Sequence, residues 1–213
     1  MNKSLNSTRK DYQKGILDFS MLPANPFQLL QQWLDQAQQE DPQDFNAMCL
    51  STVSMDGGSN ARVVLLREVL SNGLRFYTNY KSNKGQELEL NDGVSCLFFW
   101  PQMERQIRIR GKAKKSSVEV SDSYFASRPR QSQLGAWASK QSHVGNESDL
   151  LHRLKKLGEL HKNEPISRPD FWGGYDVFCT EIEFWQGRPS RLHQRVLYSL
   201  IDDAEWNHER LDP

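Results

Sequence analysis

The stretch ARVVLLREVLSNGLRFYTN, residues 61–79, contains two apolar runs separated by a short polar break. The runs at 61–69 and 74–79 are rich in aliphatic, β-branched and aromatic residues, which favour strands. The SNG sequence at 71–73 is typical of a tight turn. The stretch therefore predicts two successive strands joined by a turn.

Comparable patterns lie on both sides of this stretch. Strands are predicted at 46–54, at 94–100, where the run is apolar throughout and should be fully buried, and at 105–115, where the residues alternate. MDGGS at 55–59 is typical of a hairpin turn, and a short helix is predicted at 82–90 with Ser82 as its N-cap. Five strands with short connections favour an antiparallel barrel or sandwich over a parallel sheet with crossover helices.

The rest of the chain contains both helical and strand patterns. Residues 1–20 lack apolar periodicity and are expected to form a mobile arm, with residues 21–213 as a single domain. The fold class expected is α+β, with most of the regular structure in strands. The remaining helices are predicted at 26–39, 117–128 and 147–163, and the remaining strands at 175–186, 191–201 and 204–211.

The bulk composition limits the classes of function. The 213 residues include 27 Lys+Arg and 27 Asp+Glu, so the formal net charge is zero. Neither nucleic acid nor an acidic membrane is expected as a partner, because proteins that bind them usually carry an excess of basic residues. No secretory signal or membrane span is visible, so a cytoplasmic protein is expected. The 5 His and 3 Cys show no metal-ligand spacing, and no metal site is predicted.

Two arginines bracket four aliphatic residues in the strand predicted at 61–69. Arg62 and Arg67 either meet partners such as a bound anion or extend from the strand ends into solvent. Simple alternation places their side chains on opposite faces, so they should serve different sites unless a bulge intervenes. The residues alone leave both interpretations open.

Lys84 lies where the strand predicted at 74–79 leads into the helix predicted at 82–90. Free N–H groups and the helix dipole converge at such a point, which suits anion binding. A lysine in the first turn is unfavourable for the helix itself, which favours a bound anion as its partner. An ordinary exposed lysine is the alternative.

Arg191, His193 and Arg195 occupy alternate positions in the strand predicted at 191–201. Residues two apart in a strand point to the same face, so three cationic or protonatable groups would lie side by side. Like charges repel, and the arrangement favours a negative group between them. A charged edge strand that discourages aggregation is the alternative.

A further group of polar residues follows in SYFASRPRQSQ (123–133). Tyr124 and Arg128 are four residues apart and therefore neighbours on one helix face. Pro129 is expected to end that helix, which places Ser132 in the following turn. Such donors can hold a phosphate. A helix surface with capping residues is the alternative.

Three of the six tryptophans, Trp137, Trp172 and Trp185, lie in or beside segments that carry these polar residues. Side chains of this size are expected to pack in the core or at an interface rather than to stack on a ligand.

These stretches together resemble the pyridoxine/pyridoxamine 5′-phosphate oxidase family. The resemblance runs from Arg9 to the final RLDP, and its most specific pieces are RVVLLR, FYTN, SRPRQSQLGAWASKQS, FWGG, IEFWQG and RLHQR. It implies an FMN-binding split barrel, a Greek-key-like antiparallel β-barrel flanked by helices, in agreement with the strands predicted above. It also implies a homodimer with flavin sites at the subunit interface that draw on both chains.

The resemblance assigns residues to two phosphorylated molecules. Arg191 and His193 would be catalytic, with His193 the first candidate to handle a substrate proton and Asp44 a less favoured one. The substrate would be bound by Arg67, Tyr124, Arg128, Ser132, Arg191 and His193, with Arg9 and Tyr12 in an arm that closes over the site. The cofactor FMN would be bound by Arg62, Val63, Val64, Leu65, Leu66, Arg67, Tyr77, Thr78, Asn83, Lys84, Gln106, Gln141, Ser142, Trp185 and Arg195.

The reaction implied by the resemblance is oxidation of pyridoxine 5′-phosphate or pyridoxamine 5′-phosphate to pyridoxal 5′-phosphate. Hydride would pass from the substrate C4′ carbon to flavin N5. Dioxygen would then reoxidise the flavin and give hydrogen peroxide, with ammonia released from the amine substrate.

Two positions depart from the family pattern. Arg67 stands where the family usually has lysine, so a planar fork replaces a point charge. Asn83 stands where the family usually has arginine before Lys84, so one cation for the flavin phosphate is lost. FMN binding weaker by about 1–3 kcal/mol is expected if a charge-assisted bond is missing.

Other classes of protein remain as alternatives. The nearest is another flavin split-barrel protein with a different substrate. A non-enzymatic carrier of pyridoxal 5′-phosphate or a flavin-binding regulator would bind without turnover. A nucleic-acid-binding barrel is disfavoured by the neutral charge and by the lack of an aromatic stripe on one strand.

Overall fold

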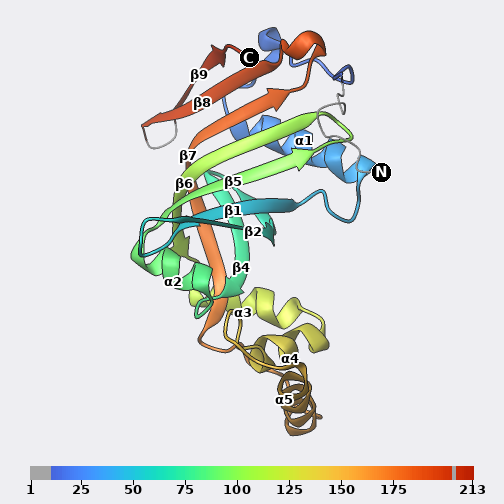
Figure 1. Cartoon of the computed structure of the whole chain (residues 1–213), viewed down its shortest axis with the longest axis vertical. Coiled ribbons are helices and arrows are strands. Elements are labelled where there is room, and N and C mark those ends of the chain that lie inside the picture. Colours follow the sequence, from blue (N-terminus) through green and yellow to red (C-terminus); the bar gives the residue numbers. More distant parts are fainter. Residues whose placement is uncertain (1–10, 203–204) are drawn as a thin grey trace, which may run out of the picture. The chain divides into compact units, whose positions relative to one another are not determined.

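The computed structural model describes residues 11–202 and 205–213 (Figure 1), so Arg9 lies outside the described residues. None of the helices in this part of the chain is long and apolar enough to span a membrane. The elements are η2 (Phe19–Met21), α1 (Pro26–Glu40), β1 (Ala47–Val53), β2 (Ser59–Leu65), β3 (Glu68–Leu70), β4 (Gly73–Asn79), α2 (Asn83–Leu90), β5 (Gly93–Trp100), β6 (Arg105–Lys115), α3 (Val118–Ser127), α4 (Arg130–Ala138), α5 (Glu147–Leu160), β7 (Trp172–Gln186), η3 (Pro189–Arg191), β8 (Gln194–Asp202) and β9 (Glu205–Leu211).

The strands belong to one sheet, hydrogen-bonded in the order β2-β1-β5-β6-β7-β4-β3, with β8 pairing with β7 and β9 with β8. The pairs β3–β4, β4–β7, β7–β8 and β8–β9 are antiparallel. The α+β class predicted from the sequence is confirmed.

The described residues fall into two compact units. The first comprises 11–49, 95–110, 179–202 and 205–213, and the second comprises 50–94 and 111–178. The boundaries fall within β1, β5, β6 and β7, so the units are segments of shared strands rather than successive stretches of chain. The mobile arm at 1–20 and the single domain at 21–213 stay predictions.

In the first unit, α1 buries its apolar face. The ring of Trp33 meets the ring of Phe184 edge-on, with centroids 5.3 Å apart. The segment that precedes α1 is held by the carboxylate of Glu104, which accepts the backbone N–H of Gln13 at 2.7 Å and of Lys14 at 2.9 Å. Residues 13 and 14 are therefore tied to the turn before β6.

In the second unit, α3, α4 and α5 lie close together (Figure 1). Phe125, Leu134, Ile166 and Trp172 form a buried apolar cluster between these helices and the start of β7. The cluster fixes the helices that carry Tyr124 and its neighbours.

The N-terminus of α2 also lies in the second unit, and its predicted cap is confirmed. Ser82 Oγ accepts the backbone N–H of Gly85 at 3.4 Å. A Cβ atom at Gly85 would lie 2.1 Å from the carbonyl oxygen of Tyr80. Only glycine permits this approach, so the first turn of α2 lies directly against the end of β4.

Several predicted elements differ from the structure. The strand predicted at 61–69 is two strands, because β2 ends at Leu65 and β3 begins at Glu68. The strand predicted at 191–201 begins only at Gln194. The run at 94–100 is not fully buried: β5 alternates, and Phe99 is 51% exposed.

The segment after α3 was also predicted wrongly. Pro129 does end α3, but α4 starts at the next residue, so Ser132 lies in a helix rather than in a turn. Proline lacks an N–H and has a fixed φ, which interrupts one helix but is tolerated at the start of another.

Candidate functional site

A cavity of about 400 Å³ lies within the second unit. The family resemblance assigns every residue that lines it, except Trp172, to FMN or to the substrate. The lining carries four cations and no carboxylate, which is unusual for a surface of a chain with no net charge. The lining residues are Arg62, Val63, Val64, Leu65, Arg67, Tyr77, Thr78, Lys84, Tyr124, Arg128, Gln141 and Trp172.

Arg62 and Arg67 line the same cavity, so the expectation that simple alternation places their side chains on opposite faces is wrong. That expectation assumed one continuous strand. The regular strand instead ends at Leu65, and the chain resumes as β3 at Glu68. The break abolishes the alternation that would have sent the two side chains to opposite faces.

The guanidinium of Arg62 donates hydrogen bonds to neutral and anionic acceptors. Its Nη1 donates to Thr52 Oγ1 at 2.5 Å and to the Leu50 carbonyl at 3.2 Å, and its Nη2 donates to Glu87 Oε2 at 3.1 Å. Glu87 also accepts from Thr52 and Asn60. Burial favours the neutral acid, but these hydrogen bonds and the charge of Arg62 outweigh it and lower the pKa of Glu87. Arg62 is thus fixed in place by an ionised carboxylate.

Lys84 is a buried cation with only neutral hydrogen-bond partners. Its side chain is 7% exposed, and Nζ donates to Thr78 Oγ1 at 3.1 Å and to Ser82 Oγ at 3.2 Å. No carboxylate among the described residues forms an ion pair with it. Burial, and secondarily the charge of Arg62, lowers the pKa of Lys84. An anion in the cavity would relieve both effects.

Three aromatic rings also line the cavity. The rings of Tyr77 and Tyr124 stack with centroids 3.7 Å apart, and the ring of Trp172 is nearly parallel to both. The guanidinium of Arg128 lies over the Trp172 ring, 4.4 Å from its centroid. Nη1 of Arg128 is buried and has no hydrogen-bond partner among the described residues. A donor in this position lacks the acceptor that a phosphate oxygen would supply.

Four assigned residues of the second unit do not line this cavity. Leu66 is 5% exposed and belongs to the core. The backbone N–H of Asn83 donates to Ser142 Oγ at 3.2 Å, which connects the start of α2 to the loop that carries Gln141. Ser142 lines a separate cavity of about 570 Å³ that also includes Gln141. Ser132 lies in the first turn of α4.

The first unit contains a second group of assigned residues. The rings of Tyr12, Trp185 and His193 meet one another, with centroid distances of 5.6, 5.7 and 4.7 Å. His193 Nδ1 accepts the backbone N–H of Arg188 at 3.1 Å, so the proton of the neutral ring is on Nε2. Burial, followed by the charge of Arg191, lowers the pKa of His193.

Arg191, His193 and Arg195 do not alternate along one strand face as predicted. Arg191 lies in the turn η3 with φ of +62°, His193 precedes β8, and only Arg195 is in the strand. Positive φ is uncommon for a residue with a side chain, and such strain tends to occur at functional sites. Glycine and proline in the preceding GRPS sequence were the available signal for this turn.

Arg195 is oriented by a buried carboxylate. Its Nε donates to Glu183 Oε1 at 2.9 Å, and Glu183 is 4% exposed. Arg108 forms an ion pair with the other carboxylate oxygen at 3.1 Å. In the sheet, Arg195 is the register partner of Trp185. Gln106 lies in β6 and is partly buried, and Asp44 is exposed in the loop before β1.

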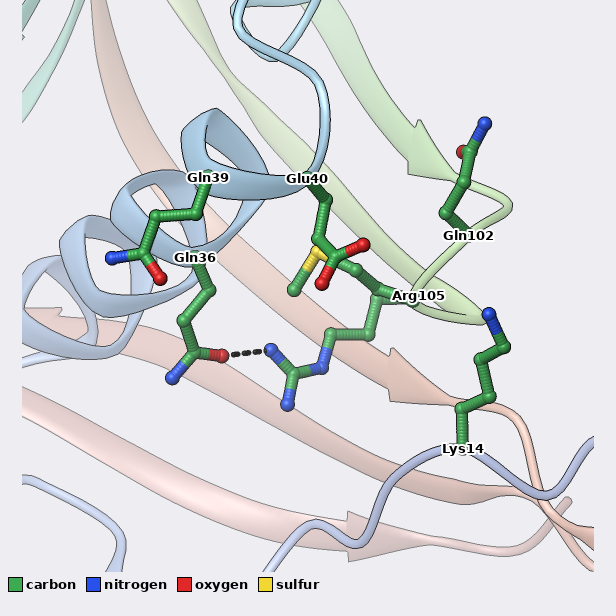
Figure 2. A pocket seen from close by; sticks show the side chains of 7 residues that line it. Lys14, Gln36, Gln39, Glu40, Gln102 and Arg105 are labelled. Carbon is green, nitrogen blue, oxygen red and sulfur yellow. Dashed lines mark hydrogen bonds between the residues drawn. The ribbon is translucent and has the colours of Figure 1, made fainter.

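Another cavity of the first unit, about 300 Å³ in volume, contains none of the assigned residues (Figure 2). Arg105 donates to Gln36 and to Gln186 there and lies over the Trp33 ring, 4.5 Å from its centroid. Its lining mixes both signs of charge and is explained by the packing of α1. The lining residues are Lys14, Gln36, Gln39, Glu40, Gln102, Met103 and Arg105.

The residues that line the 400 Å³ cavity have the chemistry that the phosphate of FMN would require. Arg62 and Lys84 supply two fixed cations, and the observation that points to a bound anion is the burial of Lys84, which forms no ion pair with any described residue. Val63, Leu65 and Tyr77 offer an apolar and aromatic wall of the kind that a flavin ring contacts.

Two family models and several known proteins match this chain. Residues 34–154 match the family model described as pyridoxamine 5′-phosphate oxidase. Residues 172–213 match the model described as the C-terminal dimerisation region of pyridoxine 5′-phosphate oxidase. The chain is 44% identical over 215 residues to the pyridoxine/pyridoxamine 5′-phosphate oxidase of Chromohalobacter salexigens, with 100% of both chains covered. It is 47% identical over 211 residues to that of Acaryochloris marina, covering 99% of this chain and 96% of the relative.

Two solved structures share the fold. PhzG from Burkholderia lata 383, in complex with tetrahydrophenazine-1-carboxylic acid, superposes with a TM-score of 0.87 at 28% identity, covering 96% of this chain and 100% of PhzG. A pyridoxamine 5′-phosphate oxidase-related, FMN-binding protein from Nostoc punctiforme superposes with a TM-score of 0.73 at 17% identity, covering 91% and 99%. The predicted split-barrel fold is confirmed.

Proposed function

The chain belongs to the pyridoxamine 5′-phosphate oxidase family and is an oxidase; from this premise we propose its substrates, cofactor and acceptor. It oxidises pyridoxine 5′-phosphate or pyridoxamine 5′-phosphate to pyridoxal 5′-phosphate, with bound FMN and with dioxygen as acceptor. The single observation that supports this most is the cavity lined by four cations and no carboxylate. Four cations are more than one phosphate requires. They suit two phosphates, one on the cofactor and one on the substrate.

The cations form two pairs. Arg62 and Lys84, with Gln141, bind the FMN phosphate, because Glu87 fixes Arg62 and Ser82, the N-cap of α2, fixes Lys84. Arg67 and Arg128, with Tyr124, bind the substrate phosphate. The unpartnered Nη1 of Arg128 supports this second assignment.

The chemistry supplied by FMN is a two-electron oxidation in which hydride leaves the substrate C4′ carbon, dioxygen is reduced to hydrogen peroxide, and water releases ammonia from the amine substrate. The protein contributes binding, orientation and a proton acceptor. His193 is neutral with its proton on Nε2, so Nδ1 is the atom that accepts the proton of the substrate alcohol or ammonium. Nδ1 can do so only after its hydrogen bond from the Arg188 N–H is broken. Arg191 orients the substrate beside it.

A homodimer is proposed as the active form. The dimerisation-region model covers 172–213, which includes Trp185, Arg191, His193 and Arg195. In the family resemblance the flavin site draws on both chains, so the residues of the first unit would serve the cavity of the partner subunit.

The test uses the purified protein and its absorbance. We expect a yellow protein whose flavin band bleaches when pyridoxamine 5′-phosphate is added without oxygen, and which forms peroxide when air is admitted. Pyridoxamine without its phosphate, at equal concentration, is the matched control and should bleach far more slowly. A protein that is colourless and takes up no FMN, or one that binds pyridoxal 5′-phosphate without turnover, contradicts the proposal.

A further inference from the structure

Trp172 lines the cavity, although the sequence predicted only a packing role for it. It is the first residue of β7, is 7% exposed, and lines the cavity together with Tyr77, Tyr124 and Arg128. Its ring is within 11° of parallel to Tyr77 and within 4° of parallel to Tyr124. It therefore contacts Tyr77, which is assigned to the cofactor, and Tyr124, which is assigned to the substrate phosphate.

Arg128 depends on Trp172 for its position. The guanidinium lies 4.4 Å from the Trp172 centroid and 5.7 Å from the Phe125 centroid. No carboxylate among the described residues forms an ion pair with it, and burial lowers its pKa. A planar cation on an aromatic face is held in one plane while its N–H groups stay free to donate. The ring thus fixes the guanidinium without consuming the donors that a phosphate needs.

Trp172 is itself braced at its backbone. Nη1 of Arg168 donates to the Trp172 carbonyl at 2.6 Å, and Nε of Arg168 donates to Asp122 Oδ1 at 2.6 Å. The backbone N–H of Trp172 donates to the Pro169 carbonyl at 3.0 Å. Asp122 lies on α3, the helix that carries Tyr124, so one nearly buried arginine links the start of β7 to that helix.

We propose that Trp172, braced by Arg168, is a positioning residue for the substrate phosphate: it holds Arg128 and Tyr124 in the arrangement that binds the phosphate. This inference rests on the proposed function, since it assigns the occupant of the Arg128 side of the cavity. It is distinct from packing alone, because it predicts a selective loss of phosphate affinity.

The test compares two Trp→Phe variants from the same aromatic cluster. Trp172→Phe keeps a ring but weakens the face available to Arg128, since tryptophan is the best aromatic partner of a cation. Trp137→Phe is the matched control. Trp137 packs against the same cluster and donates a hydrogen bond from Nε1 to the Ser167 carbonyl, but it does not line the cavity. Holoenzyme is used throughout, with thermal melting to confirm that each variant is folded.

Four quantities are measured for each variant. We expect Trp172→Phe to raise the KM for pyridoxamine 5′-phosphate about tenfold, equivalent to about 1.4 kcal/mol. The inhibition constant of inorganic phosphate should rise by the same factor, while kcat and the FMN dissociation constant change less than about threefold. Trp137→Phe should leave all of them near the wild-type values.

Equal effects of the two variants, or a fall in kcat with KM unchanged, would overturn the inference. If Trp172→Phe does not fold, Arg168→Lys replaces it, because lysine keeps the charge but cannot bridge Asp122 and Trp172 together; KM must again rise without loss of FMN. Should the wild type show no turnover, the proposed function fails by itself. Calorimetric titration with inorganic phosphate then decides the inference, which fails if wild type and Trp172→Phe bind phosphate equally.

Discussion

His193 has a hydrogen-bonding and electrostatic environment that favours its neutral form. The backbone N–H of Arg188 donates to Nδ1, and burial together with the nearby charge of Arg191 lowers the pKa. A neutral ring can accept a proton, whereas an imidazolium cannot. The residue proposed as the proton acceptor therefore stays neutral at pH values at which an exposed histidine would already be protonated.

The pH dependence of turnover tests this role. If His193 must be neutral, the acid limb of the kcat profile lies below the ordinary histidine value of 6.5. Arg191→Ala removes a positive charge that opposes protonation, so the limb should move to higher pH, with a steep fall in turnover and FMN still bound. Arg191→Lys keeps the charge and should leave the limb in place. A limb that stays fixed in Arg191→Ala would show that His193 is not the titrating group.

Helix α2 carries Lys84 in its first turn, where this lysine lines the cavity. Its N-cap Ser82 and the close approach at Gly85 fix the first turn, and Lys84 in that turn is buried toward Thr78. Asn83 in the same turn is exposed, and its backbone N–H reaches Ser142. Free N–H groups at a helix start attract anions, so position 83 is placed to add a cation to the proposed flavin phosphate site.

Asn83→Arg is expected to tighten FMN binding. One added charge-assisted hydrogen bond is worth about 1–3 kcal/mol, so the FMN dissociation constant should fall at least about fivefold. Flavin fluorescence titration of the apoprotein measures this constant, and the gain should shrink at high salt. Asn83→Gln, which lengthens the side chain without a charge, is the control. An unchanged constant in Asn83→Arg means that the departure at position 83 does not weaken FMN binding.

Among the described residues, most of the assigned ones gather into two groups, one in each unit. The cavity group is centred on Arg62, Lys84 and Arg128, and the second group is centred on Trp185 and His193. A dimerisation-region model covers the second group. The proposed homodimer, in which the partner's second group serves each cavity, would explain why one chain carries both groups.

Subunit complementation tests this sharing. Arg128→Ala and Arg191→Ala should each be nearly inactive, since each removes one part of the site. Co-expressed chains form mixed dimers with one intact site, so about a quarter of wild-type activity should return if half of the dimers are mixed. Separately purified variants, combined without exchange of subunits, are the control. If each site were built from one chain, no mixed dimer would contain an intact site and activity would stay absent.

Local sequence patterns determined most of the elements and the chemistry available to them. The alternation in RQIRIRGKAKK gives β6 its observed bounds, Arg105–Lys115, because strand geometry directs successive side chains to opposite faces. Ser82 marked the start of α2, because a serine oxygen can accept an N–H that the helix leaves free. The family motifs named nearly every lining residue of the cavity.

Only the tertiary structure decided which of these residues meet. Arg62 and Arg67 share a cavity because the regular strand is interrupted between Leu65 and Glu68. Trp172 contacts Arg128 from a segment more than forty residues away in sequence. A local pattern records the preferences of the backbone over a few residues. Breaks in strands, and contacts between distant segments, depend on packing of the whole chain and leave no periodic signal in the sequence.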